Sequence, residues 1–239
     1  MKITIGHLFY DLLNLYGENG NIKALQNAFK QQNIEVEIKE FSLNNKPWDL
    51  SNIDVFYIGA GTEANQKLAL NSLMEYKDII NDMIKDNVFF IATGNSIELF
   101  GSTIKDDETV TNGLNLFSFS TQRTKNRIVS ECVFNYDELS NKILGFENHQ
   151  GVINGISEPL FTIEKGVGSN TNSKTEGFKQ NNFYGTYLLG PLLVRNPELL
   201  EKICKEIILN KDSSFEFNDF DFNLEYAAHN KFLEKYNKD

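Results

Sequence analysis

The sequence predicts an α/β fold with a mixed, partly antiparallel sheet, in a single domain that covers residues 1–239. Short apolar stretches alternate with amphipathic stretches through the first hundred residues, an order typical of β-α-β units in a parallel sheet. The later half contains closely spaced strand-like segments, which we expect to be mainly antiparallel. Helices should therefore cover both faces of a sheet whose parallel part comes from the first hundred residues.

Four strands and two helical stretches are expected in the first hundred residues. The expected strands are 2–9, 35–41, 54–58 and 88–92. The last two are apolar without alternation, which indicates strands buried on both faces. Helices are expected at 21–32, where apolar residues share one face, and at 64–85, with a bend near Tyr76.

The second half is expected to add five strands and two helices. The expected strands are 114–120, 127–134, 142–147, 159–164 and 182–188. A helix should run over 196–209 with Pro197 in its first turn, and a terminal helix over 225–236 should lie on the outside. The polar, glycine-rich segment 166–177 predicts a mobile surface loop.

Composition limits the class of partner and the compartment. Of the 239 residues, 41% are hydrophobic and 12% aromatic, which is enough for a sizeable core. The formal net charge of −10 argues against nucleic acid or an anionic membrane as the main partner. We expect a cytoplasmic protein without membrane insertion, because no signal-peptide pattern or membrane-spanning apolar run is present.

The two cysteines do not predict a metal or redox site. Cys132 and Cys204 are far apart and match no metal-binding or redox spacing. Cys132 lies in an alternating apolar run and Cys204 in a helical one, so both should be reduced core residues. We therefore expect no metal and no cofactor.

One junction organises the predicted elements. The strand at 88–92 runs into Thr-Gly-Asn-Ser at 93–96 and then into a short helical segment that ends at Gly101. A buried strand, a sharp turn and a helix start form the geometry of a nucleophile elbow. The free N–H groups of such a helix start favour a polar or anionic ligand. Gly94 and Asn95 form the tip, so the expected elbow carries no thiol.

Three further features could bind a ligand. Gly59-Ala60-Gly61 follows a buried strand, so its N–H groups could form an oxyanion hole, although a strand-ending turn is the more common explanation of such a segment. Arg127 could clamp a carboxylate with its guanidinium fork, or could be an ordinary surface arginine. His149 could act as a base, or could be a hydrogen-bonded structural histidine.

Five segments together resemble one family along nearly the whole chain. They are 13–25 (Leu-Asn-Leu-Tyr-Gly-Glu-Asn-Gly-Asn-Ile-Lys-Ala-Leu), 59–62 (Gly-Ala-Gly-Thr), 124–127 (Thr-Lys-Asn-Arg), 145–149 (Gly-Phe-Glu-Asn-His) and 185–191 (Gly-Thr-Tyr-Leu-Leu-Gly-Pro). In order and spacing they are similar to signatures of the GatD family, the amidotransferase subunit of lipid II isoglutaminyl synthase.

The resemblance implies a fold, an activity and a partner. The fold would be that of a class I, CobB/CobQ-like glutamine amidotransferase, a flavodoxin-like fold of three layers. A family member hydrolyses glutamine and passes ammonia to a Mur-ligase-like partner, MurT. That partner amidates the D-glutamate of lipid II during peptidoglycan synthesis.

Two departures fall on the residues that carry this chemistry. Aligned on Glu98 and Gly101, Gly94 stands where the family elbow has its cysteine, and Leu189 replaces the histidine of the late signature. Hydrolysis needs a thiolate that attacks the amide and an imidazole that activates it. We therefore expect no catalytic residue at these two positions and a loss of glutaminase activity. The residues expected to remain for substrate binding are Gly59, Ala60, Gly61, Asn95 and Arg127.

Three interpretations remain open at this point. The preferred one is a non-catalytic subunit that supports a Mur-ligase-like partner and binds glutamine weakly or not at all. A second is an active glutaminase with a relocated nucleophile, but Ser96 and Thr93 beside the tip have no base in the expected place, and Cys132 is predicted on another strand. A third is a stand-alone protein that binds an amino acid or related molecule in the old pocket.

Overall fold

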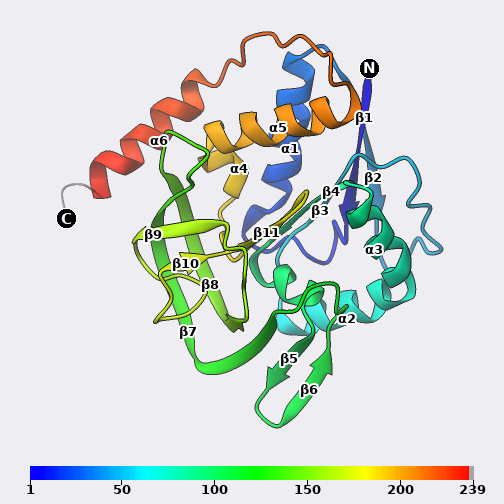
Figure 1. The fold of residues 1–239 in the computed structure, drawn as a ribbon, viewed down its shortest axis with the longest axis vertical. Coiled ribbons are helices and arrows are strands. Elements are labelled where there is room, and N and C mark those ends of the chain that lie inside the picture. The colour runs from blue at the N-terminus through cyan, green and yellow to red at the C-terminus, as the bar shows by residue number, and fades with distance from the viewer. Residues whose placement is uncertain (237–239) are drawn as a thin grey trace.

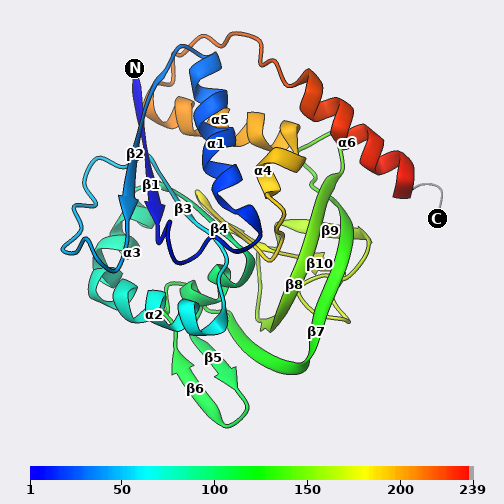
Figure 2. The same cartoon turned by 180° about the vertical axis from the view of Figure 1, so that it is seen from behind.

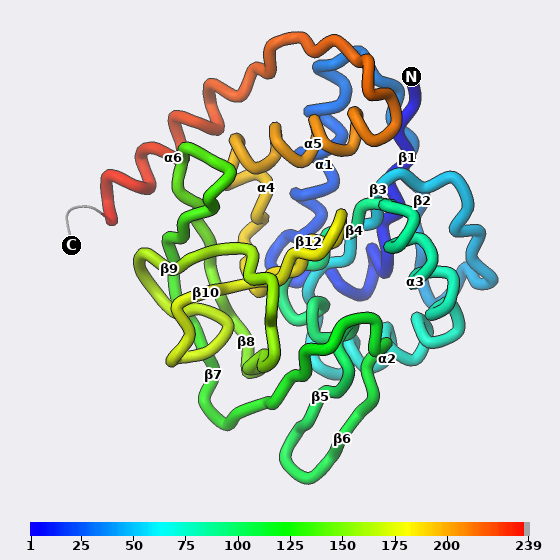
Figure 3. Tube along the Cα trace, in the orientation of Figure 1, coloured from blue at the N-terminus to red at the C-terminus, as the bar shows by residue number. Residues whose placement is uncertain are grey.

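A central six-stranded sheet runs through the computed structural model, which describes residues 1–236 (Figure 1). Its strand order is β11-β12-β4-β3-β1-β2, and every neighbouring pair is parallel except β11–β12. The strands are β1 (Lys2–Leu8), β2 (Glu35–Phe41), β3 (Val55–Ile58), β4 (Phe89–Thr93), β11 (Phe178–Gln180) and β12 (Phe183–Thr186). The predicted mixed sheet is confirmed. However, β12 from the later half joins the parallel part beside β4 (Figure 3).

Helices cover both faces of this sheet and make three layers (Figures 1 and 2). The helices on one face are α1 (Asn19–Gln31), α4 (Leu192–Arg195) and α5 (Pro197–Lys211), and those on the other are α2 (Glu63–Leu73) and α3 (Lys77–Lys85). The two sides of β4 show why its sequence does not alternate. Ile91 packs into the core beneath α1 and α5, and Phe90 packs into the core beneath α2 and α3. A 3-10 turn over Met74–Tyr76 separates α2 from α3, at the predicted bend.

A second sheet is mainly antiparallel, and of its described strands only β5 and β7 pair in parallel. Its order is β10-β9-β7-β5-β6, with β8 paired to β7. Its strands are β5 (Thr103–Asp106), β6 (Thr109–Asn112), β7 (Ser120–Asn135), β8 (Ile143–Asn154), β9 (Phe161–Lys165) and β10 (Thr175–Glu176). β7 and β8 form a long ribbon whose register shifts between Arg123 and Ile128. This ribbon carries several pocket residues toward the central sheet.

Two predictions about the later half are wrong. Most of 114–120 is not a strand, because its apolar side chains, such as Phe117 and Phe119, are buried core residues of an irregular segment. The segment 166–177 is not simply a mobile surface loop, because it contains β10 and the fully buried Glu176. The carboxylate of Glu176 accepts hydrogen bonds from the Thr186 hydroxyl (2.6 Å) and the Tyr187 N–H (2.7 Å).

The C-terminal elements follow the prediction. α5 begins at Pro197. Proline has no N–H, but no helical hydrogen bond is lost, because an N–H at the first helical position has no acceptor within the helix. α6 (Asn223–Tyr236) lies at the outside of the molecule (Figures 1 and 2). Within residues 1–236, no helix combines the length and the apolar character that crossing a membrane requires.

Candidate functional site

The predicted elbow lies at the carboxyl end of the central strand β4. Gly94 has a φ of +61° and begins a 3-10 helix, η3 (Gly94–Phe100), rather than an α-helix. A Cβ atom placed on Gly94 would lie 2.5 Å from the Ala60 Cβ and 2.7 Å from the Leu189 Cδ2. Ala60 and Leu189 therefore fill the space that the first carbon of a nucleophilic side chain would need.

The glycine-rich loop after β3 is tied to the elbow by one side chain. The Gly61 N–H donates to the Asn95 Oδ1 (3.2 Å), and the Asn95 Nδ2 donates to the Gly61 oxygen (2.9 Å). The Gly61 N–H, a candidate oxyanion donor, is thus already occupied. Gly59 does not line the pocket described below. A Cβ there would lie 2.5 Å from the Leu13 oxygen and 2.8 Å from the Glu18 Cβ, so Gly59 serves close packing behind the loop.

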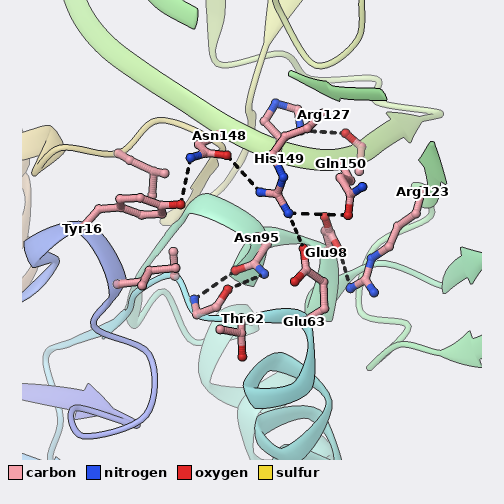
Figure 4. A pocket seen from close by; sticks show the side chains of 15 residues that line it. Tyr16, Thr62, Glu63, Asn95, Glu98, Arg123, Arg127, Asn148, His149 and Gln150 are labelled. Atoms are coloured by element: carbon pink, nitrogen blue, oxygen red, sulfur yellow. Dashed lines mark hydrogen bonds and ion pairs between the residues drawn. The ribbon is translucent and has the colours of Figure 1, made fainter. Parts of the chain in front are cut away.

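A pocket of about 290 Å³ opens between the elbow, the N-terminus of α2 and the β7–β8 ribbon (Figure 4). Its lining consists of Leu15, Tyr16, Ala60, Gly61, Thr62, Glu63, Asn95, Glu98, Arg123, Arg127, Asn148, His149, Gln150, Gly151 and Leu189. The structure therefore brings together most of the residues that the sequence singles out. Gly94 is buried beside Ala60 and Leu189.

A chain of polar side chains lies along one side of the pocket (Figure 4). The Asn148 Nδ2 donates to the Tyr16 hydroxyl (2.8 Å), and the Arg127 Nη1 donates to the Asn148 Oδ1 (2.9 Å). The Arg127 Nη2 lies 3.0 Å from the Glu63 Oε1, and both side chains remain about 40% exposed. An exposed ion pair of this kind contributes only about 0–1 kcal/mol. A ligand carboxylate could therefore replace Glu63 beside Arg127 with little loss of free energy.

Arg123 is a second guanidinium in the pocket, and sequence reasoning missed it. Its Nη1 lies 3.0 Å from the Asp106 Oδ2, and its Nη2 lies 3.6 Å from the Glu98 Oε2 and also donates to Gln66. Glu98 is fully buried and accepts from the Gln66 Nε2 (2.9 Å) and the Tyr187 hydroxyl (3.1 Å). Burial raises the pKa of Glu98, whereas the Gln66 hydrogen bond and the Arg123 charge lower it.

The hydroxyl groups of Thr93 and Ser96, beside the elbow, are hydrogen-bonded to groups behind it. The Thr93 hydroxyl donates to the Glu18 carboxylate, which also accepts from the Tyr57 hydroxyl (2.6 Å). The Ser96 hydroxyl donates to the Thr93 oxygen (2.8 Å). Burial raises the pKa of Glu18 to about 7, although the hydrogen bonds from Thr93 and Tyr57 lower it. Thr93 and Ser96 thus serve the packing of the elbow, and neither lines the pocket.

His149 has the surroundings of a structural histidine. Its Nδ1 lies 2.7 Å from the Gly151 oxygen, to which it donates, and its ring stacks on Tyr187 with centroids 3.6 Å apart. Its Nε2 faces the Glu147 Oε1 at 3.8 Å. Burial lowers the pKa of His149 to about 4. The imidazole is therefore neutral and is held between core groups.

Both cysteines are free and buried, as predicted. The Cys132 Sγ lies 3.2 Å from the Glu147 Oε2, and burial together with the Glu147 charge raises the pKa of the thiol to about 12. Burial also raises the pKa of Cys204. A thiol of this kind carries almost no thiolate at neutral pH, and neither cysteine lines the pocket.

We expect the free energy of unfolding to fall as the pH rises from about 6.5 to 9, because several carboxyl groups are buried. Burial raises the pKa of Glu18 and Glu176 to about 7 and that of Glu147 to about 9. Each such carboxyl group contributes its full stabilisation of the fold below about pH 4.5, its pKa in the unfolded chain. This contribution is lost as the pH rises through the pKa of the group in the folded protein. The lowered pKa values of His7 and His149 matter only below about 6.5. Each titrating group adds a slope of up to about 1.4 kcal/mol per pH unit.

Thermal unfolding followed by circular dichroism between pH 6.5 and 9 measures this slope. Glu147→Gln should make it shallower between pH 8 and 9, because that carboxyl group no longer titrates, while the buried thiols of Cys132 and Cys204 still contribute to the slope. The exposed Glu164 is a control position, since Glu164→Gln should leave the slope above pH 6.5 unchanged. A melting temperature that rises over this range would contradict the assignment.

Comparison with known proteins identifies the family. Residues 4–197 match the family model of the CobB/CobQ-like glutamine amidotransferase domain. The chain is 31% identical over 238 residues to the Staphylococcus aureus protein named lipid II isoglutaminyl synthase (glutamine-hydrolyzing) subunit GatD, covering 99% of this chain and 97% of the relative. The Streptococcus pneumoniae protein of the same name is 26% identical over 214 residues, 88% of this chain and 82% of the relative.

Solved structures agree on the fold. PurLQS from Thermotoga maritima aligns with a TM-score of 0.57 at 13% identity, covering 88% of this chain and 99% of that chain. The glutaminase domain of Trypanosoma brucei CTPS aligns with a TM-score of 0.54 at 10% identity, covering 91% and 95%. The predicted three-layer fold is thus confirmed, and the chain belongs to the CobB/CobQ-like glutamine amidotransferase family, to which its GatD-type signatures assign it.

Proposed function

We propose that this chain is a GatD-type subunit that does not hydrolyse glutamine and acts with a Mur-ligase-like partner of the MurT type. The complex would serve the amidation of the D-glutamate of lipid II in the cytoplasm. Similarity to two proteins named as subunits of lipid II isoglutaminyl synthase, over most of their length, supports the pathway and the existence of a partner.

One observation carries the proposed loss of hydrolysis. Ala60 and Leu189 occupy the space around the Gly94 Cα where a nucleophilic side chain would begin. The Asn95 amide also occupies the Gly61 N–H. The nucleophile and the base are therefore replaced by groups that pack together, and one oxyanion donor is occupied. Hydrolysis requires the first two, and the third accelerates it.

A relocated nucleophile has little support. The hydroxyls of Thr93 and Ser96 are hydrogen-bonded behind the elbow. The Cys132 thiol is buried outside the pocket with a pKa of about 12. His149 holds its two ring nitrogens toward Gly151 and Glu147. The stand-alone binding protein is the stronger second candidate, because Arg127 still faces a pocket of suitable size.

Affinity purification from the native organism tests both halves of the proposal. We expect the tagged chain to retain a Mur-ligase-like protein in a stoichiometric complex, and the complex to release no ammonia from glutamine. An Arg127→Ala chain should retain the same partner, since that residue serves the pocket. Purification of the chain alone would favour the stand-alone binding protein, and ordinary glutamine turnover by the complex would refute the loss of hydrolysis.

A further inference from the structure

The two ends of the pocket differ in chemistry. Arg127 provides a guanidinium on one side, held by Asn148 (2.9 Å) and Gln150 (3.5 Å). Ala60 and Leu189 provide apolar groups beside the elbow. The second guanidinium, that of Arg123, is already paired with Glu98 and Asp106. The arrangement therefore suits a molecule with a negative charge at one end and an apolar group at the other.

At the elbow end, the Gly61 N–H and the side-chain amide of Gln66 are already hydrogen-bonded within the protein. The Gly61 N–H is bound by Asn95. The Gln66 Nε2 donates to the backbone oxygen of Asn95 (2.5 Å) and to the Glu98 Oε2 (2.9 Å). An amide placed against Leu189 would lose part of its hydration and gain no hydrogen bond from these two groups, which weakens binding. An aliphatic group in the same place would gain from burial.

The charged end already holds a carboxylate that belongs to the protein. The Glu63 Oε1 lies 3.0 Å from the Arg127 Nη2, and the Glu63 side chain is 39% exposed. Glu63 sits in the first turn of α2, so it can turn outward into water without disturbing the fold. It therefore competes with a ligand carboxylate for the same guanidinium, and removing its charge should strengthen ligand binding.

We propose that this pocket binds a small carboxylate with an apolar tail, of which an aliphatic α-amino acid is the type, in preference to glutamine. The proposal rests on the proposed function, because it assigns a ligand class to the pocket that no longer hydrolyses glutamine. Arg127 receives the carboxylate after Glu63 turns away, and the apolar tail packs against Ala60 and Leu189.

Titration calorimetry with L-norleucine and L-glutamine tests the preference, because the two side chains are of similar length and differ in the terminal amide. We expect L-norleucine to bind at least tenfold more tightly than L-glutamine, a difference of about 1.4 kcal/mol. L-Norleucinol, which lacks the carboxylate, should give no heat of binding. Equal or tighter binding of L-glutamine, or no binding of L-norleucine, would overturn the proposal.

Two substitutions locate the binding site. Glu63→Gln should strengthen L-norleucine binding at least threefold, and Arg127→Met should abolish it. Glu131→Gln is the matched control, because Glu131 is a similarly exposed carboxylate that pairs with Arg195 at 3.3 Å and does not line the pocket. Weaker binding by Glu63→Gln would overturn the proposal. Ammonia release and partner retention are measured separately, so failure here is distinguishable from failure of the proposed function.

Discussion

Glutamine hydrolysis should appear only when three positions are changed together, namely Ala60→Gly, Gly94→Cys and Leu189→His. The cysteine supplies the thiolate and the histidine supplies the base. The cysteine alone would place its Cβ 2.5 Å from the Ala60 Cβ and 2.7 Å from the Leu189 Cδ2. Ala60→Gly removes the first contact, and the flat imidazole ring at position 189 can rotate to relieve the second. We expect the triple variant to release ammonia at least 100-fold faster than the unmodified chain, which should stay at background.

The oxyanion donor offers a graded extension of this experiment. Adding Asn95→Gly to the triple variant frees the Gly61 N–H, and a single oxyanion donor is worth about 10²–10³ in turnover. A variant with Gly94→Ser in place of Gly94→Cys is the matched control and should remain inactive. Alkylation of the introduced thiol by iodoacetamide at pH 6 reports whether the introduced imidazole activates it. Turnover by the unmodified chain would contradict the prediction, as would a folded triple variant that shows neither alkylation nor turnover.

Arg123→Ala should destabilise the fold by about 2–4 kcal/mol, because it leaves a buried carboxylate without its cation. Glu98 is 1% exposed, and Arg123 connects it to Asp106 on the β5–β6 hairpin. In a Glu98→Gln background the same substitution should have a much smaller effect, about 1 kcal/mol, since a neutral amide needs no counter-ion. The difference between the two backgrounds measures the coupling.

Urea unfolding of the unmodified chain, the two single variants and the double variant provides these free energies. Arg195→Ala is the matched control, since Arg195 is also mostly buried but pairs with an exposed carboxylate, that of Glu131. We expect it to lose about 1 kcal/mol or less through that ion pair. An Arg123→Ala chain as stable as the unmodified one would show that Glu98 does not require the arginine.

Local patterns predicted the central sheet well. β2 matches its predicted range of 35–41, and β3 and β4 lie within one residue of theirs. The elbow followed from the same signals, because a buried strand, Gly94 and the helix start are adjacent in sequence. The strand predicted over 114–120 was wrong because its aromatic side chains are buried without forming a strand. The ring centroid of Phe117 lies 4.7 Å from those of Phe178 and Phe183.

The remaining parts of the site depend on contacts between distant residues. Asn95 meets Gly61 across 34 positions, and Arg123 meets Gln66 across 57. No periodicity encodes such pairings, so the occupied oxyanion donor and the second guanidinium could not be predicted. The β5–β6 hairpin was missed for another reason, because its charged and threonine-rich strands show no apolar alternation and its turn depends on Asp107 at a φ of 49°.

The reciprocal bonds between Asn95 and Gly61 have a consequence for assembly. They join the loop after β3 to the turn after β4, so these two loops are held in place before any small molecule arrives. A ligand therefore has little of this wall left to order, and apart from the Glu63 side chain its binding changes the outer shape of the protein little. A partner that docks around these loops would meet the same surface with the pocket filled or empty. Assembly would then be constitutive, independent of the supply of free amino acids.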